Sequence, residues 1–596
     1  MKKVLQIFGI LALGAVLFLS YIIWLNVQPG EDSEDLLASM PDEVNPRYSS
    51  EDSTNWWKET TVYQVYPRSF KDSDGDGIGD IAGIISQLDY IQSLGFETIW
   101  FSPFFKSPQA DHGYDVSDYR EIEPAYGDLA LVDSLISEIH QRDMKIVLDL
   151  VLNHTSIEHG WFQESKKSRN NPKSDWYVWR DGKDGNPPNN WKNIPGRESA
   201  WNYVPERDQY YYAAFLPFQP DLNMANPEVK EAIFDMVRFW LDKDVDGFRL
   251  DIFNFIFEDE NYPDNPFTWQ ALPKFGEGKW AFEDHKYNFH QPEVIAFAKE
   301  LRAILEEYPD GRFMIGEVFG SHRHMRELLG MEQLDGLNLV FLFDFLEDFD
   351  FSAKYFYQKA KEYEAFYPYP MVPTYVFGNH DQFRSITRLD NNEQKAEVLA
   401  AFQLTMRGVP FVYYGEEIGM RTSDIAVEDA EDPLAKYWLG TPEWLQNYLP
   451  FMLNRDNCRT PMQWSSDTSA GFSSAEKTWL PVHDNYKEIN VQNRLEDKTS
   501  IIHTYREILQ IRNRLKALKS GQMELLEPGA PLSKNVLSYS RYHADEKYFI
   551  YLNFSDQRQS IPIDATDAIV KYQKRATLQE QTAVLEDYGI LIVEIN

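Results

Sequence analysis

Strand-like and helix-like segments alternate along most of this chain, and this alternation limits the possible folds more than any other feature does. Six short apolar segments have the composition of buried strands, at 61–67, 98–104, 145–153, 245–251, 313–319 and 373–381. Three segments between them repeat apolar residues at three- and four-residue spacing, at 81–95, 129–143 and 227–244. Strands that alternate with helices predict a parallel α/β fold.

Three of the predicted strands end at or beside a carboxylate. Asp251 closes the string GFRLD, Glu317 lies in IGEV and Asp381 closes GNHD. Glu317 and Asp381 are 381 − 317 = 64 residues apart, about two strand-plus-helix units of ~30 residues in a parallel barrel. Any one acid could simply cap a helix or pair with an arginine. Three that converge on one face of a barrel are a set suited to cleaving a glycosidic bond.

Two interruptions of the alternation suggest how the chain is divided. Residues 155–218 form a polar stretch rich in Trp, Asn and Pro that is too long for an ordinary loop, so we expect an inserted B subdomain after the third strand. The (β/α)8 barrel is then expected from 56–154 and 219–520, with 254–290 as a long loop over its active face. Short alternating strands predict a C-terminal antiparallel β-domain at 521–596.

The amino terminus has the character of a membrane segment. Lys2 and Lys3 precede 22 nearly all apolar residues from Val4 to Leu25, close to the ~20 that span a bilayer. Residues 1–28 are therefore interpreted as a signal-anchor or, alternatively, a cleaved signal peptide, and 29–55 as an acidic tether. The catalytic part is expected to be extracytoplasmic, and either membrane-anchored or, if 1–28 is removed, secreted.

Composition excludes some partners. The formal charge of −36 would repel nucleic acid but would not affect a neutral sugar. Among the 16 Trp and 34 Tyr, most are expected in the core, although aromatic planes can also stack against pyranose rings. Cys458 is the only cysteine, so no intrachain disulfide can form.

Eight ordered strings carry a family resemblance that covers roughly residues 56–596. They are GFETIWFSPFF (95–105), DLVLNH (149–154), QPDLN (219–223), GFRLD (247–251), GEV (316–318), GNHD (378–381), GVPFVYYGEE (408–417) and CRTPMQW (458–464). With these strings the chain resembles the α-amylase superfamily, glycoside hydrolase family 13, and within it the oligo-1,6-glucosidase and α-glucosidase group. The resemblance implies a TIM barrel that acts on short α-glucoside oligosaccharides.

The resemblance also implies roles for the three acids. Asp251 corresponds to the nucleophile, Glu317 to the general acid/base, and Asp381 to a third carboxylate that holds ring hydroxyls. A retaining glycosidase needs one ionised and one protonated carboxyl. Arg249, two residues before Asp251 on the same strand face, can keep the nucleophile ionised, whereas two nearby anions should raise the pKa of Glu317.

Several residues are expected to bind the substrate. By resemblance, Asp111 and Tyr114 hold the non-reducing terminal glucose and Arg459 lies near Asp111, which would close the pocket and make the enzyme exo-acting. The other expected substrate contacts are His154, Phe215, Gln219, Arg249, Ile252 and His380. Either histidine could instead be a satisfied core residue. Ile252, which follows the nucleophile, favours α-1,6 linkages because the resembling 1,6-specific enzymes also carry a branched residue there.

An acidic loop precedes the first predicted helix. Its residues Asp72, Asp74, Asp76, Ile78 and Asp80 have the alternating oxygens and tight glycine turn of half a calcium loop, but no Glu follows at the twelfth position of an EF-hand. Related α-glucosidases bind Ca²⁺ through the matching side chains and the Ile78 carbonyl, so a structural calcium ion is expected, and no organic cofactor. The alternative is a solvated acidic turn.

Two other functions remain open at this level. A transglucosylase or sucrose isomerase would share the covalent chemistry and differ only in which hydroxyl attacks the intermediate. A non-catalytic transporter heavy chain would combine a membrane helix with the same barrel. The three acids argue against the second alternative, and no cysteine near the membrane segment could bond a light chain.

Overall fold

The computed structural model describes residues 53–595 apart from 195, 197, 272–273, 275–276, 348, 443–445, 447–451, 530–532 and 564–567. The predicted membrane segment, 1–28, lies outside the described residues, as does nearly all of the predicted tether. Among the helices that are described, none is long and apolar enough to cross a bilayer.

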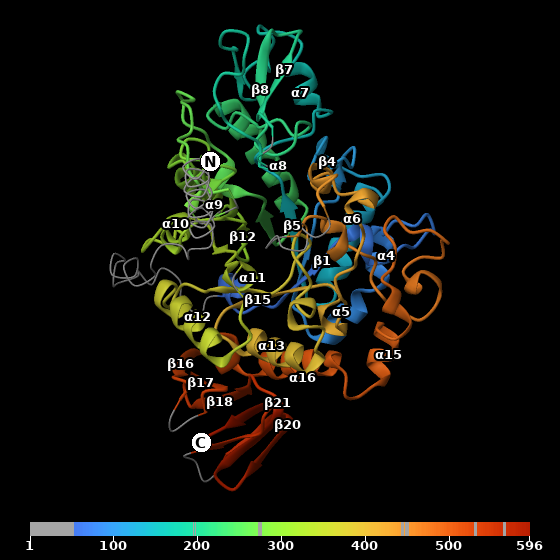
Figure 1. Ribbon diagram of the computed structural model, residues 1–596, viewed down its shortest axis with the longest axis vertical. Helices are drawn as coiled ribbons and strands as arrows, with labels where there is room; N and C mark the ends of the chain where they lie inside the picture. Colours follow the sequence, from blue (N-terminus) through green and yellow to red (C-terminus); the bar gives the residue numbers. More distant parts are fainter. Residues whose placement is uncertain are drawn as a thin grey trace, which may run out of the picture.

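Eight parallel strands form a nearly closed barrel in the order β13-β12-β9-β5-β2-β1-β15-β14 (Figure 1). They are β1 (Val62–Val65), β2 (Thr98–Phe101), β5 (Lys145–Leu150), β9 (Gly247–Leu250), β12 (Phe313–Gly316), β13 (Leu339–Val340), β14 (Thr374–Val376) and β15 (Val409–Tyr413). At the seam between β13 and β14, the Thr374 hydroxyl accepts from the Leu342 amide at 3.0 Å and donates to the Val340 carbonyl at 2.9 Å. A side chain therefore bridges the two strands.

Helices surround the strands (Figure 1). They include α4 (Ile81–Ser86), α5 (Leu88–Leu94), α6 (Leu129–His140), α8 (Pro227–Asp242), α9 (Glu293–Leu305), α10 (His322–Leu328), α11 (Asp344–Glu347), α12 (Ala353–Phe366), α13 (Glu393–Thr405) and α16 (Ile501–Arg514). Polar side chains start several of them: Asp80 accepts from the Gly83 amide before α4, and Asp128 accepts from the Leu131 amide before α6. The segment predicted as one helix at 81–95 is two helices, which meet at Gln87.

Apolar side chains fill both faces of the barrel wall. One buried cluster from alternate strand positions includes Val62, Trp100, Val147, Ile315, Leu339, Val376 and Phe411. A larger cluster packs strand residues such as Ile99, Ile146 and Phe248 with residues of the surrounding helices. Parallel strands covered on both faces are expected to be buried throughout, and every residue of β1, β2 and β9 is buried, including the polar Gln64 and Arg249.

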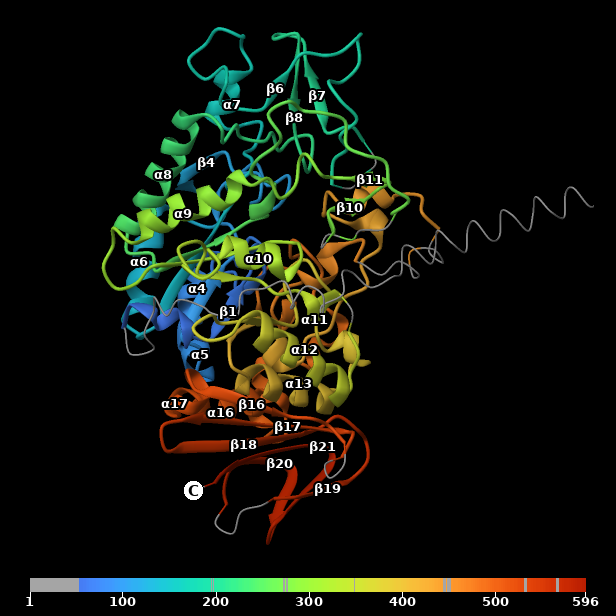
Figure 2. The same ribbon diagram turned by 90° about the vertical axis from the view of Figure 1, so that its left-hand side faces the viewer.

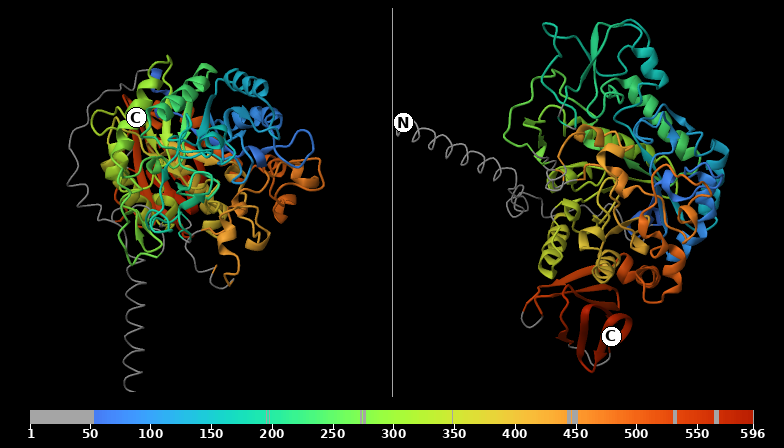
Figure 3. Two further views of the ribbon diagram at one scale, coloured as in Figure 1. Left: turned by 90° about the horizontal axis from the view of Figure 1, so that it is seen from above. Right: turned by 45° about the vertical axis from the view of Figure 1, so that its right-hand side comes forward.

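Two smaller antiparallel sheets lie at opposite ends of the barrel (Figures 2 and 3). Between β5 and α8, β6 (Trp179–Arg180), β7 (Trp201–Val204) and β8 (Gln209–Tyr212) form one sheet, next to α7 (Gly160–Ser165). After α16 and α17 (Lys516–Lys519), β16 (Gln522–Leu526), β17 (Val536–His543), β18 (Glu546–Asn553), β19 (Gln559–Pro562), β20 (Ile569–Gln579) and β21 (Thr582–Glu594) form the other. The prediction of a C-terminal antiparallel sheet is confirmed.

The long segment after β9 carries little regular structure. It contains the short helix η2 (Phe253–Phe255) and a hairpin of β10 (Lys279–Trp280) and β11 (Glu283–Asp284). Trp280 packs in one buried cluster with Ile252, Phe255 and Phe289. The hairpin therefore packs against the residue that follows Asp251.

Candidate active site

One buried arginine lies among three carboxylates at the carboxyl ends of neighbouring strands. Arg249 on β9 pairs in register with Asp149 on β5, and its Nη1 lies 2.7 Å from Asp149 Oδ1. The same Nη1 is 2.6 Å from Asp251 Oδ1, while Nη2 is 2.7 Å from Glu317 Oε2. Side-chain exposure of Arg249 is 2%, so these pairs are screened very little by solvent. A single guanidinium joins Asp251 to Glu317.

Glu317 also receives a hydrogen bond from the main chain. The Ile252 amide donates to its Oε2 at 3.0 Å, and the Phe253 amide donates to its carbonyl at 2.8 Å. Ile252 adopts a left-handed conformation, with φ 38° and ψ 45°. Such a conformation is unusual for a β-branched residue and costs energy that the surroundings must offset. Here it turns the amide of Ile252 toward the carboxyl of Glu317.

Burial dominates the electrostatics of these acids. It raises the pKa of Glu317 to about 8, reinforced by the charges of Asp251 and Asp381 and opposed by Arg249. Burial likewise raises the pKa of Asp251 to about 7, against the attraction of Arg249. The pKa of Asp381 behaves differently: burial opposes its ionisation, but the guanidinium groups of Arg455 and Arg459 hold it below the usual range. Glu317 thus retains its proton to the highest pH of the three.

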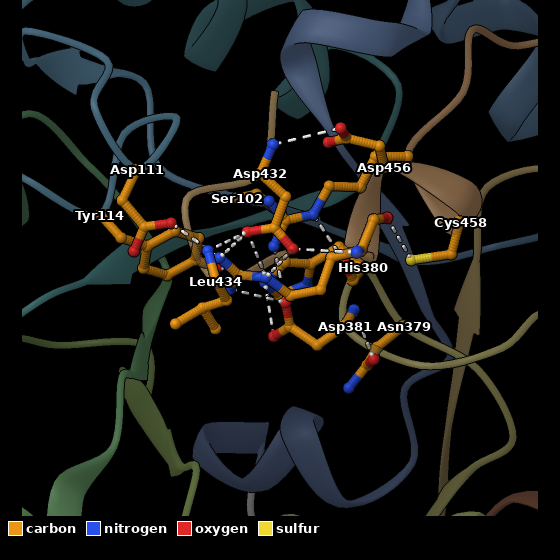
Figure 4. Close-up of polar contacts among 12 residues, drawn as sticks. Ser102, Asp111, Tyr114, Asn379, His380, Asp381, Asp432, Leu434, Asp456 and Cys458 are labelled. Atoms are coloured by element: carbon orange, nitrogen blue, oxygen red, sulfur yellow. Dashed lines mark hydrogen bonds and ion pairs between the residues drawn. The ribbon is translucent and has the colours of Figure 1, made fainter. Parts of the chain in front are cut away.

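The expectation that Arg459 lies near Asp111 is refined by the structure: burial raises the pKa of Asp111 and Arg459 is close enough to oppose that rise, but the direct contact comes from another arginine. Arg455, not Arg459, contacts Asp111, with Nη2 2.8 Å from Asp111 Oδ1. Arg459 instead reaches Asp381 Oδ1 at 2.6 Å through Nη2 and the His380 carbonyl at 2.8 Å through Nε. Arg455 begins the short helix η8 (Arg455–Cys458) and Arg459 directly follows it. Both reach Asp381 Oδ1, Arg455 through Nη1 at 3.3 Å, and Arg455 also contacts Asp111. Figure 4 shows Asp111 and Asp381 on opposite sides of this group of contacts.

Four of the residues expected to contact the sugar, Tyr114, His154, Gln219 and His380, form one buried network. The Tyr114 hydroxyl lies 2.6 Å from His380 Nε2 and donates to Asp149 at 3.2 Å, and its ring stacks on His380. Gln219 donates to Asp111 Oδ2 at 3.0 Å. His154 is also buried, with Nε2 3.0 Å from the Tyr114 carbonyl. These contacts bring the residues together.

Both histidines are already engaged within the chain. His380 Nδ1 lies 2.8 Å from the side-chain nitrogen of Gln64, and burial lowers the pKa of its ring to about 3, so the imidazole is neutral. His154 Nδ1 lies 3.3 Å from the side-chain Nδ2 of Asn153. Phe215 packs against the His154 ring at a centroid distance of 5.8 Å. These contacts hold both histidine rings in fixed positions at the edge of the site.

The acidic loop brings part of its predicted set together. One oxygen each of Asp72, Asp74 and Asp80 lie within 4.8 Å of one another. Asp76 is outside that group, and its Oδ1 accepts from the Ile78 amide at 2.7 Å. Asp72 also accepts from the Gly75 and Gly77 amides, at 2.7 and 2.8 Å, so the loop is folded around its carboxylate.

Comparison with known proteins identifies the family. The model of the α-amylase catalytic domain matches residues 64–521, which is more than half of the chain. The chain belongs to the α-amylase family. An oligo-1,6-glucosidase of Parageobacillus thermoglucosidasius is 38% identical over 84% of this chain and 91% of its own length. An α-glucosidase of Candida albicans is 36% identical over 87% of this chain and 98% of its own length.

Two solved structures of similar enzymes share the architecture. An α-glucosyl transfer enzyme superposes with a TM-score of 0.81 at 36% identity, over 91% of this chain and 99% of that one. A trehalulose synthase superposes with a TM-score of 0.80 at 32% identity, over 91% and 100%. Together with the relatives' names, the family identifies the chain as a glycoside hydrolase of the α-glucosidase kind.

Sequence reasoning missed three members of this α-amylase site. Asp149 lies within a quoted family string, and an acid inside the apolar run of β5 was a signal that could have revealed it. Arg455 and Asp432 lie in an irregular region, and their roles arise from contacts that no local pattern marks. Nothing in the spacing of Arg455 and Arg459 shows which of them reaches Asp111.

Proposed function

We propose that this α-glucosidase is a retaining, exo-acting enzyme that releases terminal α-linked glucose from short oligosaccharides. The observation that carries the proposal is the pair of contacts from Arg249 to Asp251 and to Glu317, at 2.6 and 2.7 Å. One guanidinium can join two carboxyls only when they are close, which favours the ~5–5.5 Å separation of retaining enzymes over the ~6.5–9.5 Å of inverting ones.

In the first step, Asp251 attacks the anomeric carbon as the bond to the leaving oxygen breaks. Glu317 gives its proton to that oxygen, and a covalent glucosyl-Asp251 ester remains. Both protein contacts of Glu317 described above are to Oε2, so we assign the transferred proton to Oε1. Arg249 stabilises the negative charge of Asp251 before the attack.

In the second step, Glu317 is a carboxylate and acts as the base. It takes a proton from a water molecule, whose oxygen attacks the anomeric carbon and displaces Asp251. Asp381, kept ionised by Arg455 and Arg459, is placed to bind ring hydroxyls and to stabilise positive charge on the sugar. Both catalytic groups return to their starting protonation states.

Exo action follows from the closed end of the site. Asp111 pairs with Arg455 at 2.8 Å and accepts from Gln219 at 3.0 Å, and all three side chains are largely buried. Such a hydrogen-bonding floor can bind the hydroxyls of a terminal glucose, whereas a continuing chain would leave its polar groups unpaired. The α-1,6 preference proposed for Ile252 is supported by its position directly after Asp251, against the β10–β11 hairpin.

We also propose a structural Ca²⁺ ion in the acidic loop. The converging oxygens of Asp72, Asp74 and Asp80 suit a hard cation that prefers oxygen ligands, and the Ile78 carbonyl is the proposed additional ligand. Asp76 would need to turn away from the Ile78 amide to join them. The ion would tie the loop together next to α4 and would take no part in the chemistry.

The amino-terminal apolar segment supports a proposed extracytoplasmic location, with Val4 to Leu25 as an anchor or a signal. Fractionation of cells that produce the full chain, followed by amino-terminal sequencing, tests this proposal. Recovery from membranes with Met1 or Lys2 as the first residue would mean an anchor. Recovery in the soluble cytoplasmic fraction would contradict the proposal.

Glucose release tests the activity itself. Protein lacking residues 1–50 should release glucose from isomaltose faster than from maltose, and Asp251→Asn should abolish both activities while leaving the fold intact. Sucrose belongs in the same experiment, because the structural relatives include a trehalulose synthase. Conversion of sucrose into an isomer, with little free glucose, would favour the transglucosylase function. No reaction with any sugar would favour the non-catalytic alternative.

A further inference from the structure

Asp432 is fully buried behind the arginine that closes the site. Its carboxylate accepts from Arg455 at three places: the main-chain amide at 2.9 Å, Nε at 3.1 Å and Nη2 at 2.7 Å. The exposed fraction of its side chain is 0%, compared with 28% for Asp381. Figure 4 shows Asp111, Asp381 and Asp432 around one group of polar contacts. Asp432 is thus the member of this group that is most remote from solvent.

Arg455 contacts three acids through different atoms. Nε and the main-chain amide face Asp432, Nη1 reaches Asp381 at 3.3 Å, and Nη2 is shared between Asp432 at 2.7 Å and Asp111 at 2.8 Å. A free arginine side chain has many rotamers, and either carboxylate alone could pull it aside. An acid that holds Nε fixes the plane of the guanidinium and leaves its outer edge toward the pocket.

The segment that carries Asp432 is bound to the Arg455 segment along its length. The Asp432 and Glu431 amides donate to Asp456 Oδ2 at 3.1 and 2.7 Å. The Ile425 amide donates to Asn457 Oδ1 at 2.6 Å. The two segments therefore exchange hydrogen bonds in both directions, and Asp432 cannot move far from Arg455.

The same segment reaches the inserted region at its other end. The Tyr437 hydroxyl donates to Glu198 at 3.3 Å and accepts from the side-chain Nδ2 of Asn193 at 3.4 Å. Residues 423–437 thus link the closed end of the pocket to the segment that precedes β7.

We propose that Asp432 is a positioning residue that makes the pocket a dead end, by holding Arg455 across Asp111 and Asp381. It touches no substrate and acts only through Arg455. This inference rests on the proposed exo-acting site and adds the residue that fixes its specificity. Loss of Asp432 frees Arg455 to pair with Asp381 alone, so the terminal glucose loses its recognition at Asp111.

Binding of 1-deoxynojirimycin, an iminosugar shaped like terminal glucose, tests the proposal without requiring turnover. Calorimetry should show that Asp432→Asn weakens its binding about 10- to 100-fold, the range typical of replacing a residue that orients a ligand-binding group. Asp424→Asn, the same substitution at an exposed acid of the same segment, is the control and should change nothing. In parallel, KM for isomaltose should rise more than kcat falls.

The decisive comparison uses a background without Arg455. If Asp432 acts only through Arg455, adding Asp432→Asn to Arg455→Ala should change the dissociation constant by less than about twofold. The double variant removes the Asp432 charge together with its arginine partner, so neither of these two is left buried without the other, and the comparison serves even where Asp432→Asn alone does not fold. An equal loss in both backgrounds would overturn the proposal, as would tight binding by a folded Asp432→Asn.

The outcome separates this inference from the proposed function. In one outcome, wild-type protein binds the iminosugar tightly, loses this binding on Asp432→Asn, and hydrolyses no glucoside. That result would overturn the proposed exo-glucosidase function and support the positioning role of Asp432. If wild-type protein hydrolyses isomaltose while Asp432→Asn binds the iminosugar as tightly as wild type, the proposed function is supported and the positioning role of Asp432 is overturned. A wild-type chain that neither binds nor hydrolyses would overturn both.

Discussion

The Ile252 amide donates a hydrogen bond to Glu317 Oε2 at 3.0 Å from a left-handed backbone conformation. A conformation of this kind costs about 1–3 kcal/mol for a non-glycine residue. The β-branched side chain is held there by packing with Phe255 and Trp280. The residue that follows the proposed nucleophile therefore helps to position the proposed acid.

Replacing Ile252 tests the linkage preference. Ile252→Thr keeps the branched carbon and the amide but places a hydroxyl in the apolar cluster beside the site. We expect the ratio of kcat/KM for isomaltose to that for maltose to fall about 10- to 200-fold, because a single such contact contributes roughly 1–3 kcal/mol. Ile252→Val should leave the ratio nearly unchanged. An unchanged ratio in the Thr variant would remove Ile252 as the determinant.

Replacing Glu317 tests the acid and base roles. Glu317→Gln can still accept the Ile252 amide but cannot supply a proton, so kcat for isomaltose should fall about 10²- to 10⁴-fold. A 2,4-dinitrophenyl α-glucoside needs no proton for departure and should show a rapid burst followed by slow turnover. Added azide should restore turnover, with the glycosyl azide as the product. Equal losses on both substrates would contradict the assignment.

The activity should have a bell-shaped pH dependence. Asp251 must be ionised, so kcat/KM should fall as pH drops below its pKa of about 7. Glu317 must be protonated, so kcat/KM should also fall as pH rises above its pKa of about 8. With the dinitrophenyl substrate, Glu317→Gln should lose the alkaline limb and keep the acidic one. Retention of the alkaline limb in that variant would assign it to another group.

Calcium should stabilise the protein through the acidic loop. At 100 times the dissociation constant, a bound ion raises the free energy of unfolding by about 2.7 kcal/mol, so chelation should lower Tm measurably. Asp74→Asn should remove this calcium-dependent shift, because Asp74 approaches Asp72 and Asp80 but is exposed, and its contact with the Asp76 amide at 3.1 Å can also be accepted by an asparagine oxygen. Asp89→Asn, an exposed acid on α5, is the control. A calcium shift of wild-type size in Asp74→Asn would exclude this loop.

Much of the barrel could be predicted because strands and helices follow local patterns. All six predicted strands contain a barrel strand, and Asp251 and Glu317 directly follow β9 and β12. Two strands were missed. β13 has only two residues, too few for any pattern, and β15 lies in a string that was read as a motif and not as a strand. Short strands such as β13 are specified by their neighbours.

The sequence by itself determined the alternation of elements and the carboxylates at strand ends, because both depend on residues close together in the chain. Only the tertiary structure decided that Asp111 pairs with Arg455, a contact across 344 residues, and that Arg459 pairs with Asp381. It also decided that Asp432 supports Arg455 from behind. Which of several charged groups meet depends on how distant segments pack, and burial then sets the pKa of each group that meets.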